Sequence, residues 1–413
     1  MNLYLHFPFC RSKCAYCALH SYVGRSEAER ARYVDGLLHQ LNHLFASTQN
    51  SKLKTLNSKL STLYFGGGTP ALCNLQPLLD FFAPHLSPPI PQSATRNPEL
   101  GTQNPEPGTQ NSKLKTLNSK LPTEFTVELN PLDVSPELLR QLKAGGVNRL
   151  SMGVQSFDDE TLRAMGRPHT AEHARTAWRQ IRDAGFDNAG IDLICGWPDE
   201  WRKGAASDAW KRTLDAAAEL APDHCSVYTL ILEPKTRLAH DVANGRVTLP
   251  SDDVALAELA AAEQALAAIG LERYEISSFA KPGRECRHNL ATWRGEDYIG
   301  IGDGACSREG NAVSRVIFRL RLLKEGFSPA QAAADFPELA PRVAEWCATL
   351  DRFAAEGLLT AHPSPLNPHP ETQNSEPVTL NSKLKTLNSK LKMTYRLTPR
   401  GAEVCDTILA ELV

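Results

Sequence analysis

Residues 3–17 form a short apolar run followed at once by three cysteines, Leu3-Tyr4-Leu5-His6-Phe7-Pro8-Phe9-Cys10-Arg11-Ser12-Lys13-Cys14-Ala15-Tyr16-Cys17. An apolar run of this length is typical of a buried strand. The cysteines form a C-x3-C-x2-C array, and clustered thiols in a reducing compartment bind metal or take part in catalysis more often than they form disulfides. We expect most of the seven other cysteines, which are scattered, to be small buried side chains.

Further apolar runs alternate with helical patterns after this stretch. Strands are expected at 62–65, 125–129, 150–154, 189–194 and 226–231, and helices at about 26–45, 75–83, 136–144, 170–184 and 207–220. This alternation predicts βαβ units and a parallel sheet, as either a doubly wound sheet or a partial (β/α)6 barrel of the TIM type. The polar motifs come directly after strands, where barrel chemistry is built, so we favour the α/β barrel.

The rest of the chain predicts a second module. We divide the sequence into a core at 1–235, a connecting segment at 236–310 that closes the barrel, and a C-terminal module at 311–413. The module's order of helix, helix, strand pair and helix is winged-helix-like. Its second helix, expected at 340–356, carries Glu345, Asp351 and Glu356, which phosphates would repel, so we do not expect nucleic acid as a partner.

The undecapeptide NSKLKTLNSKL occurs three times, at 50–60, 111–121 and 381–391. These copies lie in low-complexity stretches near 48–61, 88–123 and 363–392. Copies this far apart cannot stack as a solenoid, and their asparagine, serine and neighbouring proline residues disfavour a stable helix. We interpret all three as insertions in surface loops.

Composition excludes several classes of protein. The chain has 413 residues, of which 42% are hydrophobic and 22% charged, so a large core is available and wholesale disorder is excluded. A net charge of −2 gives no general attraction to nucleic acid or anionic membranes. No apolar run is long enough to span a bilayer, and the first residues lack the features of a signal peptide, so we expect a cytoplasmic protein.

The cysteine array itself predicts an iron–sulfur centre. The thiolates of Cys10, Cys14 and Cys17 can bind three irons of a 4Fe–4S cubane, which leaves the fourth iron open to another ligand. The alternative is a structural zinc site with His6 or His20 as fourth ligand. Zinc sites normally use two separated cysteine pairs, and no second pair is present.

The array and its place after the first strand resemble the radical S-adenosylmethionine (SAM) superfamily. Gly66-Gly67-Gly68-Thr69-Pro70 follows the second expected strand, where that family has its methionine-binding glycines. The resemblance implies a 4Fe–4S cluster, SAM bound to its open iron, and an electron donor such as flavodoxin or ferredoxin. Reduction of the cluster would cleave SAM to a 5′-deoxyadenosyl radical.

Later motifs are similar to those of one branch of this superfamily, which contains oxygen-independent coproporphyrinogen III dehydrogenases and HemW-type heme chaperones. The motifs are Glu128-Leu129-Asn130-Pro131, Asn148–Phe157, Gly166–His169, Asp192–Pro198 and Tyr274–Ser277. By matching position, the resemblance implies that SAM is held by Tyr4, Tyr16, Gly67, Gly68, Thr69, Glu128, Gln155, Arg167 and Asp192. Thr229 and Cys306 match two further contact positions.

Two features favour the chaperone over the dehydrogenase. Leu19 stands where the dehydrogenases have a further cysteine, and the first cysteine is already residue 10, which leaves no room for their N-terminal arm.

His288-Asn289-Leu290-Ala291-Thr292-Trp293 resembles the heme-associated H-N-x-x-Y-W motif, with Thr292 in place of tyrosine. The resemblance implies that His288 binds heme, with Cys286 as the next ligand to test.

We therefore expect a heme chaperone that delivers heme to acceptor hemoproteins, such as membrane-associated respiratory enzymes. Two alternatives remain open. The chain could be a coproporphyrinogen III oxidase that acts by radical decarboxylation, or a pseudoenzyme that keeps the cluster without turnover.

Overall fold

The computed structural model describes residues 1–46, 60–86, 123–198, 208–308, 312–363 and 393–413. The chain divides into two compact units. The first contains Met1–Ser87, Thr123–His288 and Asp297–Arg308, and the second contains Asn289–Glu296 and most of the chain after residue 308.

The first unit is built on a nine-stranded sheet of order β11-β1-β4-β5-β6-β7-β8-β10-β9. Seven neighbouring strands are parallel: β11 (Tyr298–Ile301), β1 (Asn2–Phe7), β4 (Thr62–Gly67), β5 (Glu124–Leu129), β6 (Arg149–Gln155), β7 (Ala189–Cys195) and β8 (His224–Thr229). β10 (Ser278–Ala280) and β9 (Glu272–Arg273) add antiparallel pairs at the β8 edge. The six consecutive βα units confirm the predicted partial barrel.

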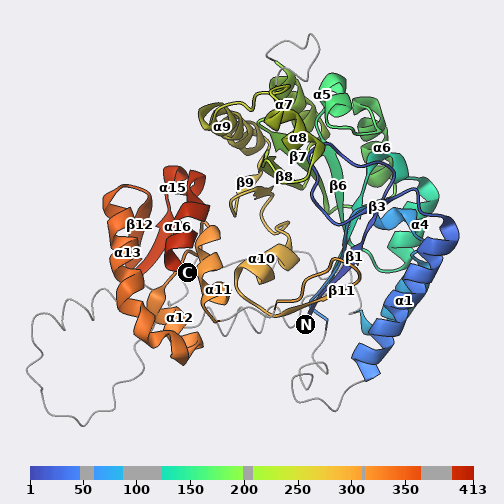
Figure 1. Cartoon of the computed structure of the whole chain (residues 1–413). Helices are drawn as coiled ribbons and strands as arrows, with labels where there is room; N and C mark the ends of the chain where they lie inside the picture. Colours follow the sequence, from blue (N-terminus) through green and yellow to red (C-terminus); the bar gives the residue numbers. More distant parts are fainter. Residues whose placement is uncertain (47–59, 87–122, 199–207, 309–311, 364–392) are drawn as a thin grey trace, which may run out of the picture. The chain divides into compact units, whose positions relative to one another are not determined.

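Helices cover the outer face of this sheet (Figure 1). They are α1 (Glu27–Ala46), α2 (Gln76–Phe82), α4 (Pro136–Ala144), α6 (Ala171–Asp183), α7 (Ala209–Leu220) and α9 (Asp252–Ala268). The short helices α5 (Asp159–Ala164) and α8 (Arg237–Ala243) belong to a separate apolar cluster around Ala15. The hydrophobic core lies between the sheet and these helices, where strand residues such as Phe65 and Phe125 pack with Leu37 and Phe82. The helices predicted at 26–45, 75–83, 136–144, 170–184 and 207–220 are therefore confirmed.

The opposite, inward face of the sheet is polar. Because strand side chains alternate, the neighbours of the core residues point away from the helices. On β1 and β4 the register places Asn2 beside Thr62 and Tyr4 beside Tyr64. A complete TIM barrel instead fills its interior with apolar side chains. The polar interior predicts that this barrel holds a polar ligand.

Local sequence signals explain where several helices begin. The Ser26 hydroxyl and the Glu29 carboxylate form a capping box at α1. Ser135 accepts a hydrogen bond from the Leu138 amide at α4, and Thr170 caps α6. Each cap thus fixes the residue at which its helix begins.

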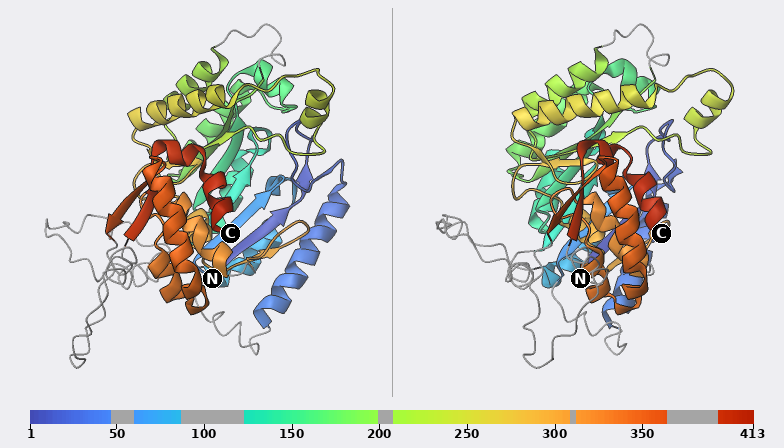
Figure 2. Two further views of the ribbon diagram at one scale, coloured as in Figure 1. Left: turned by 60° about the vertical axis from the view of Figure 1, so that its left-hand side comes forward. Right: turned by 90° about the vertical axis from the view of Figure 1, so that its left-hand side faces the viewer.

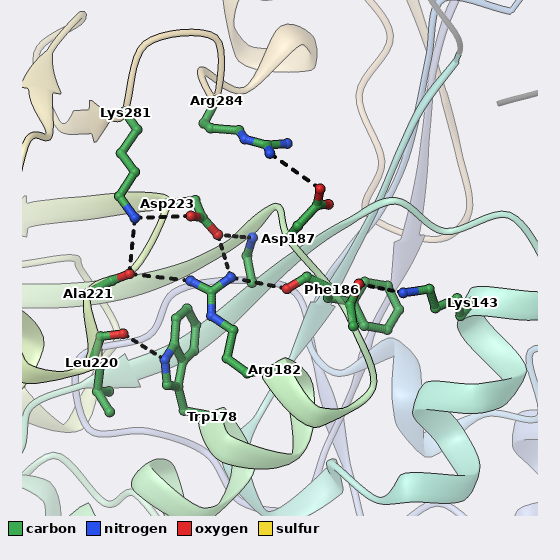
Figure 3. A network of polar contacts seen from close by, with 12 residues as sticks. Lys143, Trp178, Arg182, Phe186, Asp187, Leu220, Ala221, Asp223, Lys281 and Arg284 are labelled. Atoms are coloured by element: carbon green, nitrogen blue, oxygen red, sulfur yellow. Dashed lines mark hydrogen bonds and ion pairs between the residues drawn. The ribbon is translucent and has the colours of Figure 1, made fainter. Parts of the chain in front are cut away.

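A polar network ties α6 to the strands beside it (Figure 3). Asp223, just before β8, accepts hydrogen bonds from Arg182 at 2.6 Å and from the Ala189 amide at 3.1 Å. Lys281 lies 3.2 Å from the other carboxylate oxygen of Asp223. The guanidinium of Arg182 also lies over the ring of Trp178. One carboxylate thus joins α6, β7 and the segment after β10.

The second unit has the predicted order of helices and strands. It contains α11 (Ala312–Ile317), α12 (Pro329–Asp335), α13 (Val343–Ala355), the antiparallel pair β12 (Leu359–Pro363) and β13 (Met393–Leu397), α15 (Pro399–Glu403) and α16 (Cys405–Leu412). Figure 2 shows α13 beside the β12–β13 pair. Trp346 and Phe327 are fully buried and form the centre of this unit.

Almost all of the three repeated insertions lies outside the described residues. The exception is Leu60, the last residue of the first copy, which is buried in the core of the first unit. Its carbonyl accepts a hydrogen bond from the Thr123 hydroxyl. The interpretation of 50–60 as a surface loop is therefore wrong at this residue. No helix within the described part of the chain is long and apolar enough to cross a membrane.

Candidate functional site

A cavity of about 660 Å³ opens at the carboxyl ends of the parallel strands. All three cysteines of the array and most of the residues predicted to hold SAM line it: Cys10, Cys14, Cys17, Tyr16, Gly67, Gly68, Thr69, Glu128, Gln155, Arg167, Asp192 and Thr229. These residues come from loops and strand ends spread over 220 positions of the sequence, as expected for a site at the top of a barrel.

The cysteine loop is fixed at its ends and at its middle. The two-residue strands β2 (Phe9–Cys10) and β3 (Tyr22–Val23) pair with each other and bring the ends of the loop together. At the middle, the Ala15 amide donates to the Met165 carbonyl, and the Ala15 carbonyl accepts from the Leu238 amide. The loop is thus held in place by protein contacts alone.

The donor set suits an iron–sulfur cluster better than a zinc ion. Cys10, Cys14 and Cys17 are free and partly exposed. Within the described residues, no three side chains of the metal-binding types converge on one point. In a cubane each iron takes one thiolate, so the three sulfurs need not converge. His6 and His20, the candidate zinc ligands, are engaged elsewhere, with the His6 imidazole between the Tyr4 hydroxyl and the His20 carbonyl.

The glycine loop lies close against the cysteine loop. A Cβ atom at Gly68 would lie 2.5 Å from the Phe9 carbonyl oxygen and 3.0 Å from the sulfur of Cys10. Gly67 has a φ of +107°, and a Cβ there would lie 2.5 Å from the His6 ring. Both positions therefore require glycine, and any side chain would push the two loops apart.

Glu128 joins the glycine loop to the barrel interior. Its Oε2 accepts a hydrogen bond from the Gly67 amide at 2.9 Å, and its Oε1 accepts one from the Tyr64 hydroxyl at 2.8 Å. Burial and the nearby charge of Asp192 raise the pKa of Glu128 to about 7, although these hydrogen bonds act in the opposite direction. The carboxyl group can therefore change its protonation state near neutral pH.

Arg167 is held by two neighbours that belong to quoted motifs but were given no role of their own. Its Nη2 donates to Asn130 Oδ1 at 2.5 Å and to the Gly153 carbonyl at 2.7 Å. Asn130 in turn donates to the Thr69 hydroxyl at 2.6 Å. Nε of Arg167 is buried without a protein partner, so this guanidinium keeps a free donor. A ligand carboxylate in the cavity would satisfy that donor.

Gln155 and Asp192 complete the far side of the cavity. Gln155 has a φ of +70° at an irregularity in the β6–β7 pairing, an uncommon conformation for a residue other than glycine. Asp192 accepts hydrogen bonds from the Ser151 hydroxyl. Burial raises the pKa of Asp192, while hydrogen bonds from Ser226 and Ser151 and the charge of Arg149 oppose the shift.

His169 also lines the cavity and was given no role by sequence reasoning. Its Nε2 lies 3.0 Å from the Val154 carbonyl and therefore donates, which leaves Nδ1 as an acceptor. That nitrogen is buried without a protein partner. Burial lowers the pKa of His169 to about 3, so the ring is neutral. His169 thus offers an unused acceptor to a bound ligand. The motif Gly166–His169, quoted from the sequence, is the signal that could have identified it.

Three predicted ligand residues do not line the cavity. Tyr4 lies deeper in the barrel, with its hydroxyl 3.0 Å from Nδ1 of His6. Cys306 is exposed after β11, whereas the six other cysteines outside the array are buried as expected. The His288 side chain is only 7% exposed and lies 2.9 Å from the Thr62 hydroxyl. Heme ligation by His288 stays a prediction, and it requires this side chain to become accessible.

Comparisons with known proteins show the family of this chain. A family model described as the radical SAM superfamily matches residues 4–209. The chain is 34% identical to a Bacillus subtilis (strain 168) protein named heme chaperone HemW, over 74% of this chain and 70% of that protein. It is also 34% identical to the Escherichia coli (strain K12) protein of the same name, over 74% and 69% of the two chains.

One solved structure is similar over the whole chain. It is described as coproporphyrinogen III oxidase (HemN) from Escherichia coli, a radical SAM enzyme, with a TM-score of 0.65 and 21% sequence identity. The match covers 100% of this chain and 89% of that one. At this identity the likeness shows the fold alone.

The chain therefore belongs to the radical SAM superfamily. Membership implies a 4Fe–4S cluster and SAM, and the donor set of the cavity suits both. Within the superfamily the chain is a HemW-like protein, because it is 34% identical to two proteins of that name over 74% of its length.

Proposed function

We propose that this protein is a heme chaperone that binds a 4Fe–4S cluster, SAM and heme, and that it delivers heme to acceptor hemoproteins. The observation that carries the proposal is the cavity in which three free cysteines, a glycine loop and two half-buried carboxylates meet. The name of its relatives, heme chaperone HemW, supports the heme part of the proposal.

In this proposal Cys10, Cys14 and Cys17 bind the cluster, which supplies an open iron and an electron. Arg167 and His169 present an unused donor and an unused acceptor to SAM. Glu128 and Asp192 accept hydrogen bonds from its amine or ribose hydroxyls. The glycine loop brings backbone groups within reach of the methionine end.

Apolar side chains at the cavity mouth support a role in tetrapyrrole binding. Leu19, Tyr228 and Ile231 are exposed and line the cavity. Exposed large apolar side chains that gather at a cavity usually mark a binding surface. Leu19 stands where the dehydrogenases have a further cysteine. This one residue therefore argues against the dehydrogenase alternative and adds an apolar side chain at the mouth of the cavity.

Anaerobic reconstitution with iron and sulfide tests the proposal. We expect about four irons and four sulfides per chain, SAM binding, and binding of one heme, with no sustained oxidation of coproporphyrinogen III by the same sample. Cys10→Ala, Cys14→Ala and Cys17→Ala should each abolish the cluster. Zinc in place of iron, or a cluster that survives all three changes, would contradict the cluster assignment, and repeated turnover of coproporphyrinogen III would favour the oxidase.

A further inference from the structure

The side chain of His288 lies at one end of a series of contacts that leads to the cavity. Its ring packs against Tyr64, with centroids 5.1 Å apart, and against Tyr4, with centroids 6.2 Å apart. We propose that His288 is a positioning residue for the SAM pocket, which acts through Tyr64 on Glu128 and the glycine loop. This inference rests on the SAM-binding part of the proposed function.

The orientation of the His288 ring is fixed by a directional hydrogen bond. Asn2 Nδ2 donates to the Asp297 carbonyl at 3.2 Å, so Asn2 Oδ1 faces Thr62. The Thr62 hydroxyl gives its single proton to that oxygen, at 3.0 Å, and must therefore accept from Nδ1 of His288. Burial lowers the pKa of His288 to about 4, so at neutral pH the ring is neutral and carries its proton on Nδ1.

Tyr64 transmits this orientation to the cavity. Its ring packs against that of His288, and its hydroxyl donates to the Glu128 carboxylate at 2.8 Å. The same carboxylate accepts from the Gly67 amide at 2.9 Å. A movement of the Tyr64 ring therefore changes the position of a carboxylate that lines the cavity and of the glycine loop bonded to it.

Close packing leaves this series of contacts little freedom. A Cβ atom at Gly66 would lie 2.8 Å from the Tyr64 ring and 3.0 Å from the Glu128 carboxyl group. The backbone of the glycine loop thus lies directly against the Tyr64–Glu128 pair. Because well-packed groups shift together rather than deform, loss of the His288 ring should change the position of Gly67.

SAM affinity of the reconstituted protein tests the proposal. We expect His288→Ala to raise the dissociation constant for SAM roughly tenfold, and Thr62→Val, which keeps the shape but removes the hydroxyl, to raise it several-fold. His288→Asn keeps a polar group at the Nδ1 position and should recover part of the loss. Iron content per chain should stay at the wild-type value in all three variants.

A double-mutant cycle separates positioning from general destabilisation. Tyr64→Phe removes only the hydroxyl that holds Glu128, so the combination of His288→Ala and Tyr64→Phe should weaken SAM binding no more than the larger single change. The matched control is His224→Ala. His224 is a second buried histidine of the first unit, bonded to the Tyr274 hydroxyl at 2.9 Å, and its loss should change SAM affinity less than twofold.

The outcomes distinguish this inference from the function on which it rests. If wild-type protein binds SAM and His288→Ala binds it equally well, the positioning role is wrong and the proposed function stands. Additive losses in the double variant, or an equal loss in His224→Ala, would also overturn the positioning role. If the wild-type protein with its cluster does not bind SAM, both the proposed function and this inference fail.

Discussion

Nη1 of Arg167 lies 3.5 Å from the sulfur of Cys14 and donates a hydrogen bond to it. The same guanidinium is held by Asn130 and by the Gly153 carbonyl. The position of this positive charge is thus set by the barrel before any ligand binds. Hydrogen bonds to cluster sulfurs raise the reduction potential of iron–sulfur centres. In the proposed function Arg167 therefore belongs both to the cluster environment and to the SAM pocket.

Replacement of Arg167 by leucine should lower the reduction potential of the cluster. A hydrogen bond worth about 1 kcal/mol corresponds to roughly 40 mV for a one-electron couple, so we expect a shift of tens of millivolts. Potentiometric titration followed by electron paramagnetic resonance measures it. Arg163→Leu is the control, because this nearby arginine is exposed and pairs with Glu160. An unchanged potential in Arg167→Leu would contradict the Arg167–Cys14 interaction.

SAM affinity should depend on pH through Glu128. Its pKa is raised to about 7, so the carboxylate that would accept from SAM is protonated in acid and ionised above neutrality. Affinity should therefore rise by up to about tenfold per pH unit below pH 7 and level off above it. Titrations between pH 6 and 8 measure this slope. Glu128→Gln should bind more weakly and without the slope, and a slope that persists in this variant would assign the titration to another group.

The network of Figure 3 should stabilise the first unit through Asp223. Asp223→Asn leaves Arg182 and Lys281 without their carboxylate, which we expect to cost about 2 to 4 kcal/mol in the free energy of unfolding at pH 7. Urea denaturation measures the loss. Asp187→Asn is the control, because Asp187 is mostly exposed and its contact with Arg284 is longer, at 3.4 Å.

The effect of Asp223 on stability should vanish in acid. Burial raises the pKa of Asp223, but the hydrogen bonds from Arg182, Ala189 and Lys281 outweigh it and hold the pKa below its ordinary value. A carboxylate with a depressed pKa stabilises the fold above its unfolded value of about 3.9, and this contribution is lost as the pH falls through the folded value. The difference between wild type and Asp223→Asn should thus shrink below pH 4. A difference that is constant from pH 7 to pH 3 would contradict the charge-based account.

Deletion of the first repeat should be tolerated only if Leu60 is kept. Removal of residues 50–59 shortens a connection between α1 and β4 and should change the unfolding midpoint little. Removal of 50–60 also takes a buried leucine from the core and should cost about 2 to 5 kcal/mol. Thermal unfolding of the two variants compares them directly. Equal stability would show that Leu60 contributes nothing to the core.

Much of the barrel could be predicted because its signals are local. The apolar run at 3–7, the capping box at Ser26 and the cap at Thr170 each act within a few residues. β9 and β11 were missed because strands of two and four residues show no usable alternation. Leu60 was misread because its surroundings are a low-complexity repeat.

The sequence predicted the motifs that form the site but not the contacts that link them. The array, the glycine loop and the carboxylates come together as expected, because each lies on or directly after a strand of one sheet. The links between them depend on contacts between distant segments, such as that of Thr62 with His288, 226 residues further along the chain. No pattern within a single sequence reports such a contact, and the same holds for the support of Arg167 by Asn130.

Heme delivery tests the central claim most directly. Protein reconstituted with its cluster and loaded with one heme is mixed anaerobically with the apo form of a respiratory hemoprotein, and the activity of that acceptor is followed together with the loss of heme from the donor. We predict that the acceptor gains activity in step with heme loss, faster than with the same concentration of free heme. No transfer above the free-heme control, with repeated conversion of coproporphyrinogen III by the same sample, would contradict the chaperone account.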